Sequence, residues 1–147
     1  MISQHRCKLL QDFFTDVLNK RNIDQLADFV SPDFVFSPKL TGVPDTRAGF
    51  QQMLTILFIQ YPDLTYTLDA IHAQGTRVDI EWTANASHPG GLIGKKGVII
   101  RVGRRLCWHG RTTAIVRNGR IEALLMQQDD ASLREQLVQM PDILTEN

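Results

Sequence analysis

Histidines and carboxylates are the residues of this chain best suited to chemistry, because no cofactor or nucleophile motif accompanies them. The four histidines, His5, His72, His88 and His109, are scattered, and no cysteine cluster lies near them. A zinc site needs ligands at short, paired spacings, so we expect no metal centre. No serine stands in a nucleophile elbow either. The chemistry that remains is acid–base catalysis by a carboxylate or a histidine in a pocket.

A glycine-rich segment at residues 90–96 superficially resembles a phosphate-binding loop. Its sequence is Gly-Gly-Leu-Ile-Gly-Lys-Lys, and its outer glycines are one residue too close together. Lys96 also stands where a magnesium-binding Ser or Thr would be needed. We therefore expect no bound nucleotide and, more generally, no cofactor.

Charge is unevenly distributed along a chain whose formal net charge is zero. No acidic residue occurs between Glu81 and Glu122. That stretch holds eight basic residues, Lys95, Lys96, Arg101, Arg104, Arg105, Arg111, Arg117 and Arg120. The basic region could steer an anionic ligand or could be a solvated, arginine-rich sheet surface. Few aromatic residues are interleaved with it, which argues against nucleic acid as a partner.

Length and hydropathy indicate one domain, residues 1–147, in the cytoplasm. The chain has 147 residues and 43% hydrophobic residues, enough to form one core. No stretch approaches the ~18 consecutive apolar residues of a membrane span, and the first residues do not resemble a secretory signal. We therefore expect Cys7 and Cys107 to be reduced thiols.

Helical periodicity dominates the first third of the chain. Apolar residues recur at helical spacing from Cys7 to Leu18, and a short second helix is expected over residues 23–30. A short strand, residues 34–36, follows. Asp45 or Thr46 then begins a third helix, which ends at Tyr61-Pro62-Asp63.

Alternating patterns dominate the rest of the chain. Strands are expected over residues 64–73, 77–87, 97–102, 105–117 and 120–128, with a closing helical turn at 132–137. Asn118-Gly119 predicts a two-residue hairpin, because a type I′ turn needs positive φ at both central residues. Helices followed by an antiparallel meander indicate an α+β fold.

The last strand is apolar on both faces. Ile121, Ala123 and Leu125 alternate with Leu124 and Met126, so each set is expected to meet protein. One face would pack on the helices and the other on a second subunit, which predicts a homodimer.

Four segments of the chain resemble the SnoaL-like polyketide cyclase family in order and spacing. Trp82 and residues 88–94 match a Trp-bearing strand followed by H-x-G-x-x-x-G. Residues 118–122, Asn-Gly-Arg-Ile-Glu, are similar to the family's hairpin turn. Residues 129–137 resemble its closing D-x-x-x-L-x-x-Q-L, and residues 61–64 resemble the f-P-D-l that ends its third helix.

The resemblance implies an α+β cone fold, in which N-terminal helices pack on the concave face of a curved antiparallel or mixed sheet. Nuclear transport factor two and ketosteroid isomerase share this fold. In the cyclases, the aspartate of the closing motif is the acid–base group of a cofactor-free aldol ring closure. That role carries over to Asp129. The competing interpretation of Asp129 is a helix cap, and Asp130 could take either role.

Other site residues follow from strand alternation. His88 continues the face of Trp82 and could bond a substrate oxygen or anchor the glycine-rich loop. Trp82 is expected to be a pocket wall or core, and Leu125 and Gln127 share the predicted face of Asp129 and are expected to contact the substrate. His109 could face either way and is kept as a substrate-binding candidate.

Two departures from the family pattern limit the inference about substrate. The family places a histidine before the hairpin, where this chain has residues 113–116, Thr-Ala-Ile-Val, and a tryptophan where it has Leu124-Leu125. The sequence therefore predicts a cofactor-independent enzyme acting on a small carbonyl-rich or polyketide-like molecule. The alternative is an accessory module that binds a hydrophobic small molecule without transforming it.

Overall fold

The computed structural model describes residues 2–38, 41–87, 92–93, 99–100 and 105–129. In chain order the elements are α1 (Ile2–Asp12), the π-helical η1 (Phe13–Asn19), the 3-10 helix η2 (Ile23–Gln25), α2 (Leu26–Phe29), β1 (Val30–Ser37), α3 (Arg47–Gln60), β2 (Thr65–Gln74), β3 (Arg77–Ser87), β4 (Leu92–Ile93), β5 (Ile99–Ile100), β6 (Arg105–Arg117) and β7 (Arg120–Gln128).

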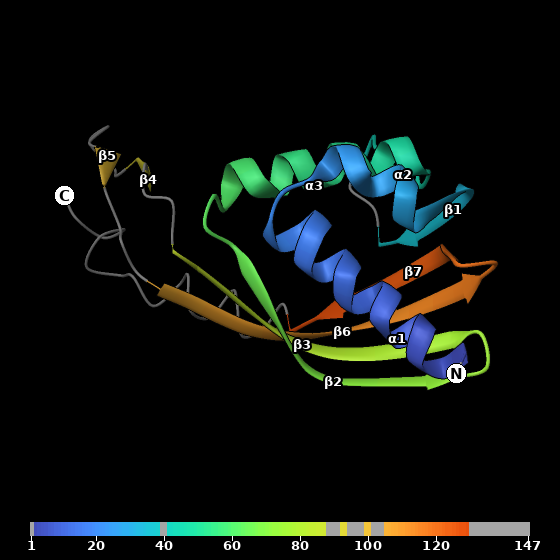
Figure 1. The fold of residues 1–147 in the computed structure, drawn as a ribbon. Coiled ribbons are helices and arrows are strands. Elements are labelled where there is room, and N and C mark those ends of the chain that lie inside the picture. The colour runs from blue at the N-terminus through green and yellow to red at the C-terminus, as the bar shows by residue number, and fades with distance from the viewer. Residues whose placement is uncertain (1, 39–40, 88–91, 94–98, 101–104, 130–147) are drawn as a thin grey trace.

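The main sheet has five strands in the order β1-β7-β6-β3-β2. Strand β1 runs parallel to β7, and all other neighbours are antiparallel, so the sheet is mixed and open. The helices lie together on one face of this sheet (Figure 1). This arrangement confirms the predicted α+β class and the packing of the N-terminal helices on the sheet.

Local signals in the sequence set several element boundaries. The Thr46 hydroxyl accepts a hydrogen bond from the Gly49 N–H at 3.3 Å and caps α3, which ends at Gln60 before the predicted stop. Asn118 and Gly119 have φ of 54° and 74°, as the predicted type I′ turn between β6 and β7 requires. The predicted strands 77–87 and 105–117 coincide with β3 and β6.

Strand β1 is longer than predicted and displaces the end of the second helix. It begins at Val30, which pairs with Ile121, and pairing with β7 resumes at Val35 after a register shift. The irregularity lets the strand pass through Pro32, which cannot donate to a ladder. Tertiary pairing with β7 therefore overrides the helical pattern at Val30.

The predicted alternation of β7 is wrong at Ile121, whereas Ala123 and Leu125 alternate with Leu124 and Met126 as predicted. Ile121, Ala123 and Leu125 do not share one face, because the pairing of β6 and β7 shifts between Ile115 and Val116. Val116 pairs with Ile121 and Ile115 with Ala123, so two positions of β6 face three of β7. Ile121 and Leu124, three residues apart, are consequently both buried.

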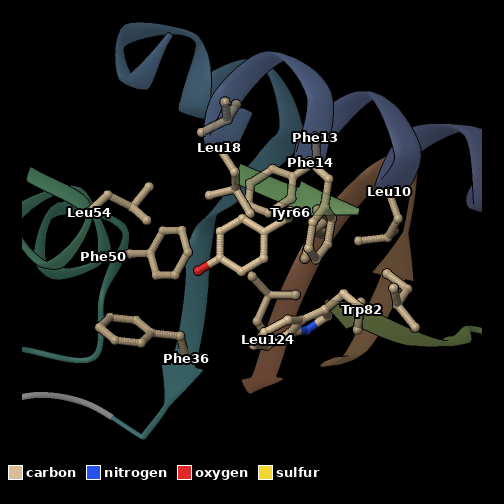
Figure 2. Close-up of a cluster of buried hydrophobic side chains, with 14 of the residues drawn as sticks. Leu10, Phe13, Phe14, Leu18, Phe36, Phe50, Leu54, Tyr66, Trp82 and Leu124 are labelled. Atoms are coloured by element: carbon tan, nitrogen blue, oxygen red, sulfur yellow. The ribbon is translucent and has the colours of Figure 1, made fainter. Parts of the chain in front are cut away.

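Aromatic side chains of the helices and the sheet meet in the core (Figure 2). Phe13 packs against Phe14 and Phe50, and Phe50 also contacts Phe36 edge-on with ring centroids 5.0 Å apart. Tyr66 lies between the helices and the sheet: Phe14 is 5.7 Å from its ring centroid and Trp82 is 5.0 Å from it. These contacts join η1 and α3 to β1, β2 and β3.

Some predictions fall outside the described residues. These are His88, Asp130, the closing turn at 132–137 and most of the strand at 97–102, of which Ile99–Ile100 is described. Cys7 and Cys107 do not form a disulfide. In the part of the chain that the structure describes, no helix is long and apolar enough to cross a membrane.

Candidate functional site

A cavity of about 580 Å³ lies between α3 and the sheet. Helix α3 contributes Met53, Ile56, Leu57 and Gln60, and the following turn contributes Tyr61. Three aromatic residues of β2, β3 and β6 form the sheet side. Residues 125–128 of β7 and Ser37-Pro38 at the end of β1 complete the lining. Its size is typical of a small-molecule site. We call it the main cavity.

The sheet side of the main cavity contains a row of one small and two large residues. Tyr66 pairs with Ala84, and Ala84 pairs with Trp108, so the three side chains stand on one face of adjacent strands. All three are buried, and both aromatic residues line the cavity. Ala84 between them is fully buried and is not one of the lining residues.

Trp82 lies across the neighbouring strand and reaches Thr112. Its indole Nε1 donates a hydrogen bond of 2.9 Å to the buried Thr112 hydroxyl. The ring passes over Gly110, where an added Cβ would stand 2.2 Å from Cζ2 and 2.3 Å from Cη2 of the indole. Gly110 is thus required by the close approach of the ring. Trp82 lines the main cavity and is part of the core, so both sequence interpretations of this residue describe its position.

The start of β2, which carries Tyr66, is held by residues at the end of η1. The Asn19 side chain donates to the Tyr66 carbonyl at 2.9 Å and accepts from the Tyr66 N–H at 2.8 Å. Arg21 donates to the Pro62 carbonyl at 2.9 Å and covers the ring of Phe58. These contacts join the helical layer to the turn before β2 and position Tyr66 at the cavity.

The side chains of Trp108 and Tyr66 in the main cavity have polar hydrogens with no partner among the described residues. The Trp108 Nε1 is buried without a hydrogen bond, although the side chain is only 2% exposed. The Tyr66 hydroxyl also has no hydrogen-bond partner among the described residues. Burial strongly raises the pKa of this phenol. Tyr66 therefore remains protonated at neutral pH and acts there as a hydrogen-bond donor.

The described lining of the main cavity is electrically neutral. It includes no Asp, Glu, His, Lys or Arg, and its polar groups are amides, hydroxyls and an indole. Burial raises the pKa of the Tyr61 phenol, so this residue is neutral as well. The lining described here favours an uncharged, largely apolar ligand that carries hydrogen-bond acceptors.

Asp129 follows the last residue of β7. Its backbone N–H donates to the His109 carbonyl at 2.9 Å, which extends the pairing of β6 and β7 by one residue. Asp129 is exposed, and its neighbours Gln127 and Gln128 line the main cavity. Leu125 also lines it and is 42% exposed. The structure thus brings Trp82, Leu125 and Gln127 to the border of one cavity and the backbone of Asp129 to its β7 end. Because Asp129 is opposite His109 in the pairing of β6 and β7, strand alternation directs the Asp129 side chain to the sheet face that carries His109.

His109 stands on the other face of the sheet. Its neighbour Trp108 points into the main cavity, and alternation directs His109 away from it. The His109 Nδ1 lies 3.0 Å from the Thr83 hydroxyl, which donates to Asp69 at 2.6 Å. Since Thr83 uses its only hydrogen on Asp69, His109 donates from Nδ1 to Thr83. The structure therefore does not place His109 among the described lining residues.

The basic stretch lies partly on the sheet surface in ion pairs. Arg105 contacts Asp63 at 3.3 Å, Arg111 contacts Glu81 at 3.8 Å, and Arg117 contacts Glu122 at 3.0 Å. None of these described arginines lines the main cavity. These three positions fit the solvated arginine-rich surface rather than a site that steers an anion into the cavity.

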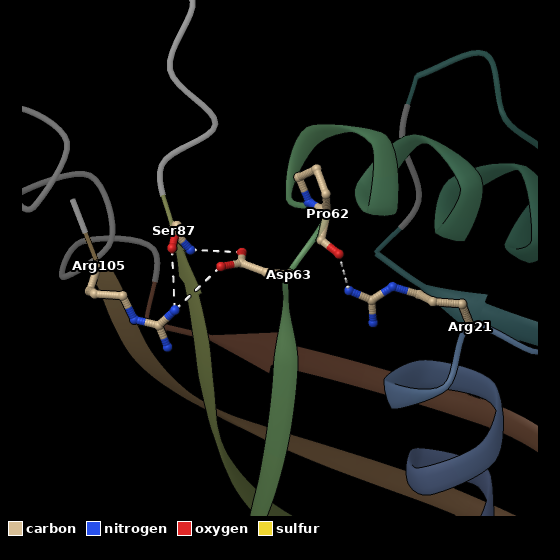
Figure 3. Close-up of polar contacts among 5 residues, drawn as sticks. All are labelled: Arg21, Pro62, Asp63, Ser87 and Arg105. Carbon is tan, nitrogen blue, oxygen red and sulfur yellow. Dashed lines mark hydrogen bonds and ion pairs between the residues drawn. The ribbon is translucent and has the colours of Figure 1, made fainter. Parts of the chain in front are cut away.

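Asp63 joins the ends of β3 and β6 (Figure 3). Its carboxylate accepts from the Ser87 N–H at 2.8 Å and from Arg105, which also donates to the Ser87 hydroxyl. Hydrogen bonds from Ser87 lower the pKa of Asp63, and the charge of Arg105 lowers it further. Pro62-Asp63, which was predicted to end the third helix, thus also anchors the end of β3 through the hydrogen bond between Asp63 and Ser87.

Tyr66 and Trp108 were not among the site residues predicted from sequence. Both occupy positions where their strands alternate, Tyr66 two residues after Leu64 and Trp108 two residues after Leu106. Their alternation indicated burial, but the pairing through Ala84 that places them on one cavity is a tertiary property. The signal available in the sequence was Trp108 itself, which stands at an inward position of its strand between the uncharged residues Leu106 and Gly110.

Comparison with known proteins decides the family. A model of the SnoaL-like polyketide cyclase family matches residues 8–137. The chain belongs to this family. No curated protein matches the sequence significantly.

Solved structures resemble this family member over nearly its whole length. IdmH of Streptomyces antibioticus, a candidate polyketide cyclase, has 22% identity and a TM-score of 0.77, and the match covers 89% of this chain and 96% of that one. A candidate polyketide cyclase of Acidithiobacillus ferrooxidans has 20% identity and a TM-score of 0.75, with 90% and 93% covered. AclR of Streptomyces galilaeus, a candidate hydroxylase, has 20% identity and a TM-score of 0.74, with 94% and 98% covered. At these identities the likeness establishes the fold.

Proposed function

We propose that the chain is a cofactor-independent enzyme that performs acid–base chemistry on a small carbonyl-rich or polyketide-like substrate. The reaction would be an aldol-type cyclisation or an isomerisation. The observation that carries this proposal is the main cavity of about 580 Å³, with neutral walls and exposed residues of β7 at the end next to Asp129. Membership of the SnoaL-like family supports the same chemistry.

The substrate would supply most of the chemical activation. A carbon between two carbonyl groups is acidic, and the carbonyls accept the electrons when its proton leaves. Asp129 would take that proton and return it at a later step, and donors of the cavity would stabilise the enolate oxygen. Leu125, Gln127 and Trp82 would contact the substrate, and His88 would contribute a polar contact.

The alternative function is binding without chemistry, and one observation favours it. The described lining of the main cavity holds no carboxylate or histidine, although an acid–base enzyme needs such a group within reach of its ligand. A passive hydrophobic module would need only the walls. The two functions differ in whether Asp129 exchanges protons with the bound molecule.

Hydrogen–deuterium exchange separates the two functions without the natural substrate. Methyl 2-naphthoylacetate has an active methylene between two carbonyls, and its exchange in D₂O is followed by proton NMR. We expect the protein to accelerate exchange above the buffer rate, because Asp129 removes a methylene proton and returns a deuteron. The substitution Asp129→Asn should reduce the acceleration by at least ~100-fold, the lower range for general acid–base catalysis.

Asp33→Asn is the matched control, because Asp33 is an exposed aspartate of β1 that does not line the main cavity. This variant should exchange at the wild-type rate. Equal exchange by the wild type and Asp129→Asn would remove Asp129 from the mechanism. Binding of the probe without any acceleration would favour the passive module.

We also infer that the chain forms a homodimer through exposed apolar residues of β1 and β7 at the border of the main cavity. Val35 is 44% exposed and Leu125 is 42% exposed, on the neighbouring strands β1 and β7. Adjacent exposed apolar residues favour a covered face. Light scattering at micromolar concentration should give twice the chain mass, and a monomeric mass would contradict the inference.

A further inference from the structure

The Trp108 indole has a hydrogen-bonding need that the described protein does not meet. An indole Nε1–H is a donor only, and leaving a buried donor without a partner destabilises the protein. Trp108 lines the main cavity, and its Nε1 is buried without a partner. An unpaired donor at a cavity wall indicates where the acceptor of a ligand fits.

Tyr66 supplies a second donor to the same cavity. Its hydroxyl has no hydrogen-bond partner among the described residues. Its backbone N–H and carbonyl are both hydrogen-bonded to the side-chain amide of Asn19. Its ring packs edge-on against Phe14 and Trp82 at interplanar angles of 84° and 83°. Figure 2 shows the hydroxyl directed toward Phe50 of α3 and Phe36 of β1. The ring is therefore held firmly, and the hydroxyl is left for a ligand.

The two donors stand on one face, two strands apart. Tyr66 and Trp108 both pair with Ala84 of β3, and neighbouring strands are about 4.8 Å apart, so their backbones are separated by about 10 Å. This spacing suits two acceptors on one ligand that spans the sheet side of the main cavity. Since both walls are aromatic, a planar ligand makes the most contact with them.

We propose that Trp108 Nε1 and the Tyr66 hydroxyl bind two carbonyl oxygens of one planar, uncharged ligand. This inference rests on the proposed function for its chemical class, because a carbonyl-rich substrate supplies the acceptors. It adds two residues that touch the substrate from the side of the sheet. The Trp82 indole is not a third donor, because Thr112 already accepts from it.

The chain contains two tryptophans, and they provide a test with an internal control. Two indole N–H signals are recorded by ¹⁵N NMR and assigned with Trp82→Phe and Trp108→Phe. The probes are 2-acetylnaphthalene and 2-ethylnaphthalene, which have similar shapes but differ in the carbonyl oxygen. We expect the ketone to move the Trp108 signal downfield much more than the hydrocarbon does, because only the ketone accepts a hydrogen bond.

The Trp82 signal should respond equally to both probes, because its hydrogen bond to Thr112 is already formed. Ring-current changes from the naphthalene affect both signals with both probes, so the difference between probes isolates the hydrogen bond. Equal movement of the Trp108 signal with ketone and hydrocarbon would overturn the proposal. Failure of both probes to bind would overturn it too.

Tyr66→Phe tests the second donor by affinity. We expect the dissociation constant of methyl 2-naphthoylacetate, which has two carbonyls, to rise about 3–10-fold and that of 2-ethylnaphthalene to stay constant. Met126→Leu is the matched control, since it alters an apolar lining residue and no donor. It should change both affinities alike, and the same result for Tyr66→Phe would contradict the role of its hydroxyl.

The predicted response of the Trp108 signal does not depend on whether Asp129 acts as a base. In Asp129→Asn the ketone should still move the Trp108 signal, whereas deuterium exchange of methyl 2-naphthoylacetate should be lost. A Trp108 response without exchange in the wild type would refute the proposed function and leave the two-donor site intact. Exchange without a Trp108 response would refute the two-donor site alone.

Discussion

Gly110 is the position at which a single methyl group should disturb the main cavity most. Alanine there would place its Cβ 2.2 Å and 2.3 Å from two ring carbons of Trp82 and 2.7 Å from the Gln127 carbonyl oxygen. Contacts below 3.0 Å require something to move, and the carbonyl belongs to the backbone of β7. The Trp82 ring is the part able to move, so its hydrogen bond to Thr112 should break.

The expected cost follows from two contributions. Overpacking in a close-packed interior costs about 1–3 kcal/mol. Leaving the buried Trp82 donor without its Thr112 acceptor costs about 1–3 kcal/mol more. Alanine regains about 0.5–1 kcal/mol because it loses less backbone entropy than glycine. We therefore expect Gly110→Ala to lower the free energy of unfolding by about 1–5 kcal/mol.

Urea unfolding of a double-mutant cycle with Trp82→Phe measures this coupling. The clashing atoms Cζ2 and Cη2 belong to the part of the indole that phenylalanine lacks. Gly110→Ala should therefore cost at least ~1 kcal/mol less in the Trp82→Phe background, where only the clash with Gln127 remains. An equal cost in both backgrounds, or a cost below ~0.5 kcal/mol in the wild type, would refute the packing argument.

Three further predictions concern the supports of the site. Thr46→Ala removes the cap of α3 and should lower the free energy of unfolding by about 0.5–2 kcal/mol in urea titrations, with Thr46→Ser nearly neutral. Asn19→Ala removes both hydrogen bonds to the Tyr66 backbone and should cost about 1–3 kcal/mol, while amide exchange at Tyr66 accelerates. Asp63 has a lowered pKa in the folded chain, so its contribution is present at neutral pH and is lost as pH falls below about 4. The stability difference between wild type and Asp63→Asn should shrink over that range, and a constant difference would contradict the role of its charge.

Much of the fold could be predicted from sequence because its signals are local. The residues of the turn at Asn118-Gly119 require positive φ, and the Thr46 hydroxyl caps the helix that follows it. Alternation located β3 and β6, whose inward residues are apolar apart from Gly110 and Thr112 of β6. Each of these features depends on neighbours within a few positions.

The errors arose where distant segments decide the structure. The register shift near Val116 changes which residues of β7 face inward, and nothing local in that strand signals it. Val30 joins β1 because β7 offers it a partner. The pairing of Tyr66 and Trp108 with Ala84 likewise depends on three strands, so their role at the cavity emerged only from the structure.

The central claim is that one cavity holds a carbonyl-rich ligand against the donors of the sheet, with Asp129 beside its acidic carbon. A crystal structure of the Asp129→Asn variant with methyl 2-naphthoylacetate tests this claim most directly. We predict carbonyl oxygens within about 3.2 Å of Trp108 Nε1 and the Tyr66 hydroxyl. The methylene carbon should lie within about 3.5 Å of the side chain at position 129. A ligand outside the main cavity, or a methylene carbon out of reach of that side chain, would contradict the account.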